Sequence, residues 1–215
     1  MGKPTLTVCI IARNEEENIK RALASAKPHA PEILVVDTGS TDATMDVARS
    51  MGANVLQFPW TDDFSAARNF ALEHASGEWV LMLDADEAIR EDTAGQLPAL
   101  LARKGVDAYR VNLVNISQGK AAPPVPITRL FRNKPFYRYH GAIHEQIVDT
   151  IVNAKGKVLD CPLVIEHYGY SAAEDFRKSR RERNLRLLER EVREHPQSAY
   201  HQYQLLLPGL FVNMC

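Results

Sequence analysis

The chain has 215 residues, of which 45% are hydrophobic and 25% are charged, and its formal net charge is −1. This length allows one medium domain with a short appendage. The composition is that of a soluble globular protein. Because the net charge is close to zero, the protein as a whole does not attract nucleic acid electrostatically. Three widely spaced cysteines, Cys9, Cys161 and Cys215, lack metal-binding spacing and indicate a reducing compartment. No run of about 18 apolar residues predicts a membrane span, so we expect a cytoplasmic protein.

The first half of the chain alternates short apolar runs with helical patterns. Strands are predicted at residues 6–11, 33–36, 55–58 and 79–83, and helices at residues 19–26, before Met51, and from Phe64 to about Ala75. Asn14 is expected to cap the first helix, with Glu15 in its first turn. This alternation predicts an α/β fold with a Rossmann-like, mainly parallel sheet flanked by helices.

Polar residues follow each of these strands. Arg13 follows the first strand, Asp37 the second, Asp63 the third, and Asp84 and Asp86 the fourth. In a parallel sheet these positions share the carboxyl edge, where ligands bind. We therefore expect a binding site at this edge, although turn and cap chemistry is the alternative for Asp37.

The most informative stretch runs from Trp79 to Glu87, where an apolar strand ends in three carboxylates. Asp84 and Asp86 are two residues apart, so extended backbone places both on one face. Mg²⁺ or Mn²⁺ bound there would keep open positions for substrate phosphates. The alternative is a solvated acidic turn. The chain has no glycine-rich dinucleotide motif and no P-loop, which disfavours those two kinds of nucleotide site.

Residues 7–15, 35–42 and 77–87 together resemble the nucleotide-sugar half of family 2 glycosyltransferases, which have the GT-A fold. Residues 60–69 resemble the subgroup of that family often joined to tetratricopeptide repeats. The resemblance implies transfer of a sugar from a nucleoside diphosphate donor, with inversion and a divalent metal, and it favours a UDP-sugar.

The same resemblance implies roles for individual residues. Asp37 would bind uracil, Asp84 would face the ribose or a metal-bound water, and Asp86 would hold Mn²⁺ or Mg²⁺. His167 would be a further metal ligand or a diphosphate contact, with a structural histidine as the alternative. Arg68 would reach phosphate or sugar, with a surface salt bridge as the alternative. The full donor site would comprise Ala12, Arg13, Asn14, Glu15, Asp37, Gly39, Ser40, Asp63, Arg68, Asp84, Ala85 and Asp86.

Residues 128–133 and 139–145 resemble the acceptor half of the same subgroup. An inverting transfer needs a base that takes a proton from the acceptor. Many family members have a Glu-Asp pair here and a later Gln-x-x-Arg-Trp motif, and this chain lacks both. Glu145 is therefore the first candidate for the base and His144 the second, with a purely structural role for Glu145 as the alternative. Arg129 and Arg132 are predicted either to contact phosphate or acceptor or to lie solvated on a strand.

Two further segments of this half have recognisable patterns. Residues 107–115 alternate apolar and polar side chains and predict a strand with one wetter face. Residues 121–126 contain three prolines and are expected to form a loop that cannot join a ladder.

The C-terminal part of the chain reads as helix from residue 171 onward. Its opening is basic and contains Arg177, Lys178, Arg180, Arg181 and Arg183, which would attract an anionic membrane or a lipid-linked acceptor, or form the solvated face of a packing helix. Residues 195–200 resemble the opening of a tetratricopeptide-type helical pair. The apolar run 205–212 indicates a truncated chain or a partner-facing tail.

We therefore expect a GT-A domain at residues 1–170 and a helical extension or truncated repeat region at residues 171–215. Residues 1–97 would form the nucleotide-binding half and residues 98–170 the acceptor half. The acceptor would be a saccharide, a lipid-linked molecule or a peptide, and the oligomeric state stays open. The alternative is a catalytically inactive GT-A-like scaffold that acts through its C-terminal helices.

Overall fold

The computed structural model of the chain describes residues 5–169 and 174–206, except for the side chains of residues 174–179, 201 and 206. The strands are β1 (Leu6–Ala12), β2 (Glu32–Asp37), β3 (Asn54–Gln57), β4 (Trp79–Asp84), β5 (Glu87–Ile89), β6 (Ala108–Ser117), β7 (Lys120–Ala121), β8 (Val125–Arg132) and β9 (Val158–His167). The helices are α1 (Ile19–Ala26), α2 (Thr44–Ser50), α3 (Phe64–His74), α4 (Glu91–Ala94), α5 (Leu97–Ala102), α6 (Val148–Asn153), α7 (Glu174–Glu194) and α8 (Ala199–Leu206).

The strands form one mixed sheet in the order β3-β2-β1-β4-β8-β6-β9-β5, with β7 paired to β6. The first four strands of this order are parallel, as predicted. The register pairs Ala12 with Asp37 and Ile11 with Asp84. The carboxyl ends of β1, β2 and β4 therefore meet at one edge, which confirms the expected geometry of that edge.

The second half of the sheet is mixed, because β8 runs antiparallel to both β4 and β6 while β9 runs parallel to β6. The prediction that residues 121–126 stay out of the ladder was wrong, since Val125 pairs with Leu113 and Pro126 with Asn112. β4 pairs only with Leu130–Arg132 of β8. At Pro126 one side of β8 therefore has no strand neighbour among the described residues, and a proline is tolerated at such an edge.

Both faces of the parallel strands are buried, which explains their nearly continuous apolar sequences. In β1, Val8 and Ile10 join one hydrophobic cluster together with α1, whereas Cys9 joins a second cluster together with α3. β4 divides in the same way, with Leu81 in the first cluster and Val80 in the second. The sheet thus separates two cores, and its carboxyl edge is held rigidly between them.

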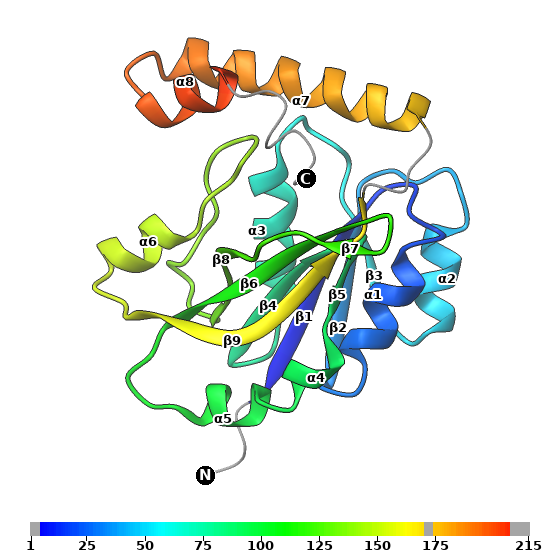
Figure 1. Cartoon of the computed structure of the whole chain (residues 1–215), viewed down its shortest axis with the longest axis vertical. Coiled ribbons are helices and arrows are strands. Elements are labelled where there is room, and N and C mark those ends of the chain that lie inside the picture. The colour runs from blue at the N-terminus through cyan, green and yellow to red at the C-terminus, as the bar shows by residue number, and fades with distance from the viewer. Residues whose placement is uncertain (1–4, 170–173, 207–215) are drawn as a thin grey trace.

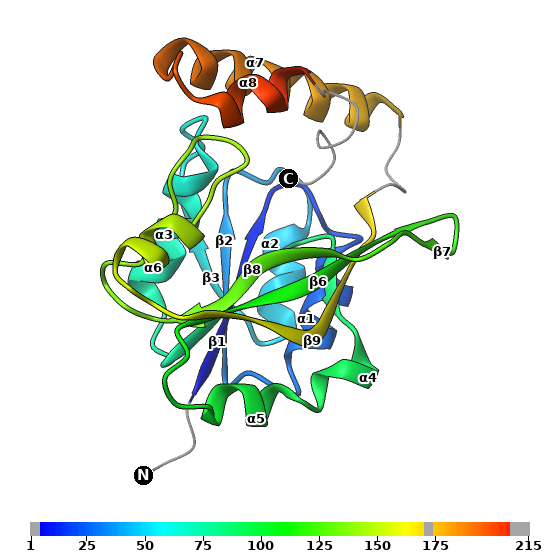
Figure 2. The ribbon, with the colours of Figure 1, turned by 60° about the vertical axis from the view of Figure 1, so that its left-hand side comes forward.

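The helices α7 and α8 lie across one end of the molecule, opposite the end at which β1 begins (Figures 1 and 2). Leu187 and Leu188 of α7 are buried against Phe64 and Ile143, whereas Leu185 is 39% exposed. The apolar run predicted at residues 205–212 lies outside the described residues from residue 207 onward. No helix in the described part of the chain is long and apolar enough to span a bilayer.

Gly77 provides a test of how tightly β1 and β4 are joined. A Cβ added there would lie 2.6 Å from the Thr7 backbone nitrogen and 2.7 Å from Thr7 Oγ1, which accepts a hydrogen bond from the Gly77 N–H at 2.8 Å. We expect Gly77→Ala to lower the free energy of unfolding by about 1–3 kcal/mol, because the two strand ends must move apart. Urea denaturation measures this change.

The matched control is Gly95→Ala, where an added Cβ meets nothing within 4 Å. Its backbone has an ordinary helical φ of −57°, so the variant should be neutral or more stable by up to about 1 kcal/mol. Equal unfolding free energies for the two variants would contradict the tight junction at Gly77.

Candidate functional site

A cavity of about 470 Å³ opens at the carboxyl edge of the sheet, and we call it the edge cavity. It is walled by the segments that follow β1, β2, β3 and β4 and by one side of α7. Its lining residues are Ile11, Ala12, Arg13, Asn14, Glu15, Thr38, Trp60, Asp62, Phe64, Asp84, Ala85, Asp86, Arg180, Arg183 and Arg186. The structure thus brings together most residues that the sequence predicted for the nucleotide-sugar site.

Asn14 joins the loops that follow β1 and β2. Its φ of 54° is left-handed, its N–H donates to Ser40 Oγ at 2.9 Å, and its Oδ1 accepts from the Thr41 N–H at 2.7 Å. The predicted capping role was wrong, because α1 begins only at Ile19, one turn later. Asn14 instead fixes the wall of the edge cavity by bridging two loops.

Asp37 lies behind this wall and is buried. Its Oδ1 accepts hydrogen bonds from the Gly39 and Ser40 N–H groups, both at 3.0 Å. Its Oδ2 is buried without a hydrogen-bond partner among the described residues. A buried carboxylate oxygen in that condition is costly unless a ligand donates to it.

Asp84 lies between two arginines. Its Oδ1 accepts from Arg68 Nη2 and its Oδ2 from Arg129 Nη2, each at 2.8 Å. Burial alone raises the pKa of the Asp84 carboxyl, but the charges of Arg129 and Arg68 outweigh it and hold that pKa well below its usual range. Both oxygens of Asp84 are thus engaged by arginines, and the carboxylate fixes the positions of the two guanidinium groups.

Arg68, on α3, also donates through Nε to Glu145 Oε1. The Glu145 side chain is 4% exposed, and its Oε2 is buried without a partner among the described residues. Arg68 therefore connects the carboxylate at the end of β4 with the predicted general base, which lies in the loop between β8 and α6.

Asp86 and His167 form a second buried pair in the site. Asp86 Oδ2 lies 3.4 Å from His167 Nε2, and His167 Nδ1 lies 2.7 Å from Asn115 Oδ1, which fixes the ring. Burial opposes charge on both groups, yet their mutual interaction lowers the pKa of Asp86 and raises the pKa of His167. A Cβ on Gly169 would lie 2.5 Å from Asp86 Oδ2 and 2.6 Å from His167 Nε2, so Gly169 leaves space beside the pair.

This pair is suited to a divalent cation, because one carboxylate and one imidazole converge there and an amide holds the other ring nitrogen. Within residues 5–169 and 174–206, no cluster of three or more His, Cys, Asp or Glu side chains could hold a metal. A cation at Asp86 and His167 would therefore take its other ligands from substrate or water.

Three arginines of α7, Arg180, Arg183 and Arg186, line the edge cavity, which was not predicted. Arg180 pairs with Glu15 and, at 3.3 Å, with Asp86. Arg183 lies over the Phe64 ring, with its guanidinium carbon 4.9 Å from the ring centroid. The expectation of a solvated face was thus wrong for these two arginines, which are partly buried because Arg180 pairs with carboxylates and Arg183 lies over an aromatic ring. Attraction of this helix to an anionic membrane or a lipid-linked acceptor stays a prediction. The side chains of Arg177 and Lys178 are outside the described residues.

Asp63 is not among the described residues that line the edge cavity, and its neighbour Asp62 is. Asp63 caps α3 by accepting from the Ala66 N–H at 3.0 Å. Asp62 Oδ1 accepts from Trp60 Nε1 at 2.7 Å and from Arg186 Nη2 at 2.9 Å. The loop after β3 is thereby attached to α7.

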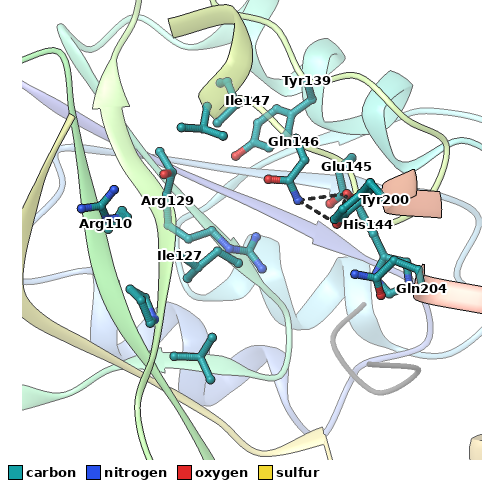
Figure 3. A pocket seen from close by; sticks show the side chains of 14 residues that line it. Arg110, Ile127, Arg129, Tyr139, His144, Glu145, Gln146, Ile147, Tyr200 and Gln204 are labelled. Carbon is teal, nitrogen blue, oxygen red and sulfur yellow. Dashed lines mark hydrogen bonds between the residues drawn. The ribbon is translucent and has the colours of Figure 1, made fainter. Parts of the chain in front are cut away.

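A second cavity of about 370 Å³ lies between the sheet and α8, and we call it the α8 cavity (Figure 3). Tyr200 and Gln204 of α8 form one wall, next to the loop that contains His144 and Glu145. Arg129 lies on the opposite side, on β8. Its partner Asp84 lines the edge cavity, so the two cavities share a wall made of charged side chains.

Residues 7–158 match the family model "Glycosyl transferase family 2". The chain belongs to this family. It is 36% identical over 201 residues to a TPR repeat-containing protein of Synechococcus elongatus, which covers 91% of this chain and 50% of that protein. It is 31% identical over 208 residues to the SPbeta prophage-derived glycosyltransferase SunS of Bacillus subtilis, which covers 91% and 47%. The chain thus spans about half the length of these relatives.

Solved structures share the architecture and confirm the GT-A fold. The 1–349 fragment of S. aureus TarS aligns with a TM-score of 0.60 at 19% identity, covering 86% of this chain and 65% of that chain. Glucosyl-3-phosphoglycerate synthase from Mycobacterium tuberculosis, in complex with Mn²⁺, UDP and phosphoglyceric acid, aligns with a TM-score of 0.58 at 20% identity, covering 80% and 73%.

Several site residues had no distinct signal in the sequence. Arg180, Tyr200 and Gln204 lie on helices whose position over the sheet is set by tertiary packing. Glu87 was noted as one of three carboxylates, but no role was predicted for it. The structure buries it beside Arg129, whose Nη2 lies 3.3 Å from Glu87 Oε1. The signal for Glu87 in the sequence was its position close after Asp84, in the same group of carboxylates.

Glu87 should make stability depend on pH. Burial raises the pKa of Glu87 to about 7, although the positive charge of Arg129 opposes this shift. The negative charge of Asp84 adds to the effect of burial. The folded protein therefore binds a proton that the unfolded chain releases above its ordinary pKa, and this contribution to stability is lost as pH rises toward and through 7. We expect Glu87→Gln to remove that loss, so the variant gains about 1–3 kcal/mol relative to the wild type between pH 5 and pH 8.

Chemical denaturation of both proteins at the two pH values measures this difference. Because all other titrating groups are shared, they cancel in the comparison. A wild-type-minus-variant difference that does not change with pH would contradict the protonation of Glu87.

Proposed function

We propose that this protein transfers a sugar from a nucleoside diphosphate sugar, most simply a UDP-sugar, to an acceptor, with inversion at the anomeric carbon. The observation that carries the proposal is the buried Arg68, which joins Asp84 at the edge cavity to Glu145 at the α8 cavity. The arrangement suits a donor on one side, an acceptor on the other, and a base between them. Two structural neighbours were solved in complex with UDP and with UDP-GlcNAc, which supports this choice.

The nucleotide would lie along the carboxyl edge of β1 and β2. Uracil presents an imide N–H, which is a hydrogen-bond donor, and Asp37 Oδ2 is a buried acceptor that lacks a partner in the described part of the chain. Ala12 and Arg13 line the cavity beside it. Buried acceptors of this kind favour a ligand with a matching donor.

The diphosphate would lie between Asp86 and α7. Asp86 and His167 would hold Mn²⁺ or Mg²⁺, which when bound stabilises negative charge on the leaving diphosphate. Arg180 and Arg183 line the same cavity, and guanidinium groups bind phosphate oxygens in bidentate geometry. The arginines of α7 that line the cavity are thus matched to a polyanionic leaving group.

In the transfer itself, the nucleophilic group of the acceptor forms a bond to the anomeric carbon. The bond from that carbon to the diphosphate oxygen breaks, and the electron pair leaves with the diphosphate. The proton of the nucleophile passes to Glu145 Oε2, while Arg68 holds the other oxygen of the same carboxylate. His144, which lines the same cavity, is the alternative base.

We place this reaction in the cytoplasm. Cys9 and Cys161 are both buried free thiols in the described part of the chain, which suits a reducing compartment.

Calorimetric titration of UDP, with and without Mn²⁺, tests the donor site first. We expect Mn²⁺ to strengthen UDP binding in the wild type and to have no such effect in Asp86→Ala. Gly169→Ala should weaken the Mn²⁺-dependent part about tenfold or more, because its methyl group would fill the space beside Asp86 and His167 without removing either ligand.

GDP is the control ligand and Gly95→Ala the control variant, since its added methyl meets open space. Absence of UDP binding to folded wild-type protein would overturn the proposed donor site. UDP binding with the same affinity in the presence and absence of Mn²⁺ would contradict the metal site alone.

Glu145→Gln tests the general base. The amide can still accept a hydrogen bond from Arg68, but it cannot take a proton, so UDP release from UDP-sugars should fall about 10²–10⁴-fold. UDP affinity should be unchanged. Unaltered turnover would instead favour His144, and His144→Ala is the variant to compare.

A further inference from the structure

The α8 cavity has polar atoms that the described protein leaves without partners. Four such atoms lie on its lining residues: the nitrogen Arg129 Nε and the oxygens Tyr139 Oη, Glu145 Oε2 and Gln204 Oε1. Tyr139 is 6% exposed, Gln204 is 7% exposed, and the Glu145 side chain is 4% exposed. Buried oxygens without partners each carry a desolvation cost, so a ligand that donates hydrogen bonds to them is favoured.

The three oxygens come from two separate parts of the chain. Tyr139 and Glu145 belong to the loop between β8 and α6, whereas Gln204 belongs to α8. The two parts are joined by Gln146 Nε2, which donates to His144 O at 3.1 Å and to Tyr200 Oη at 3.2 Å (Figure 3). α8 is thus fixed beside the candidate base, and Gln204 of this helix lines the same cavity as the loop residues Tyr139 and Glu145.

The volume of the α8 cavity and its other lining residues distinguish between possible classes of ligand. The cavity volume of about 370 Å³ falls at the lower end of the ~300–1,000 Å³ that holds small molecules. Its wall combines Tyr200 with apolar Ile127 and Ile147, which suits the C–H face of a sugar ring. A lipid chain offers no donors for the three oxygens, and an extended peptide offers one backbone N–H per residue. A saccharide offers several hydroxyl donors on one ring.

We propose that the α8 cavity binds a saccharide acceptor, and that Gln204 of α8 accepts a hydrogen bond from a hydroxyl group of this saccharide that is not the one attacked by the donor. The inference rests on the proposed function, because it assigns the acceptor side of the same site. It makes the C-terminal helix a determinant of acceptor specificity. A site that hydrogen-bonds a particular hydroxyl discriminates strongly against analogues that lack it.

Saturation-transfer NMR on the full chain with Mg²⁺ and UDP tests the inference. The probes are the methyl glycosides of glucose, galactose, mannose and N-acetylglucosamine, together with a short peptide that contains serine and cysteine. We expect at least one glycoside to give a signal, and its affinity to fall about tenfold in Gln204→Leu, which keeps the side-chain size but removes the acceptor. Gln202→Leu is the matched control on the same helix, because Gln202 is exposed and donates to Pro196 O outside the cavity.

Absence of a glycoside signal, a signal from the peptide alone, or equal glycoside affinities in the wild type and Gln204→Leu would each overturn the inference. Thermal unfolding of both variants verifies that they are folded. UDP titration of the same samples reports separately on the proposed function. Failure of the wild type to bind UDP would count against that function, whereas the glycoside comparison would still decide the role of Gln204.

Discussion

The buried guanidinium of Arg68 is the group on which the rest of the site depends. It is 1% exposed and pairs with Asp84 and Glu145, while Arg129 pairs with Asp84 and Glu87. Removing one member of such a buried ion pair typically costs about 3–5 kcal/mol, because the partner is left charged and desolvated. The cluster has two guanidinium groups and three carboxylates. Burial, together with the negative charge of Asp84, raises the pKa of Glu87, and a proton bound there removes the excess negative charge of the cluster.

The second charge system lies at the opposite wall of the edge cavity, where α7 meets the loops. Arg180 contacts Glu15 and Asp86, the second of which is the carboxylate proposed to hold the cation. A bound diphosphate would offer Arg180 an alternative anionic partner and leave Asp86 to the metal. Under the proposed function, the same arginine neutralises the site before the donor binds and the leaving group afterwards. This explains in electrostatic terms why a helix rich in arginine lies across acidic loops rather than projecting into solvent.

The sequence was sufficient for the parallel half of the fold and for the edge at which the site lies. Apolar runs and the polar residues after them place Asp37, Asp84 and Asp86 correctly, because parallel register brings strand ends together without further information. β9 was not predicted, and β8 was predicted to be a loop at Pro126, because the neighbours that a strand will have cannot be read from its own residues. The fold family was inferred from three motifs taken together, and the family match confirms it.

The sequence was not sufficient for the pairing of charges. Arg68 and Arg180 were both noted, but which carboxylates they meet depends on how α3 and α7 pack, and helical periodicity gives only the buried face. The same limit applies to Gln204, whose significance comes from a cavity formed by segments about 60 residues apart along the chain. Isolated arginines and glutamines in a sequence are therefore weak signals, and they acquire a chemical meaning only from their partners.

β4 connects the two halves of the sheet, because it pairs with β1 of the parallel half and with β8 of the mixed half. Asp84 at its end receives one arginine from α3 and one from β8. A change at this junction would disturb both cavities together, whereas a change on α8 would alter only the α8 cavity. Under the proposed function, acceptor specificity can therefore diverge through α8, while the charged junction and the donor side keep their geometry.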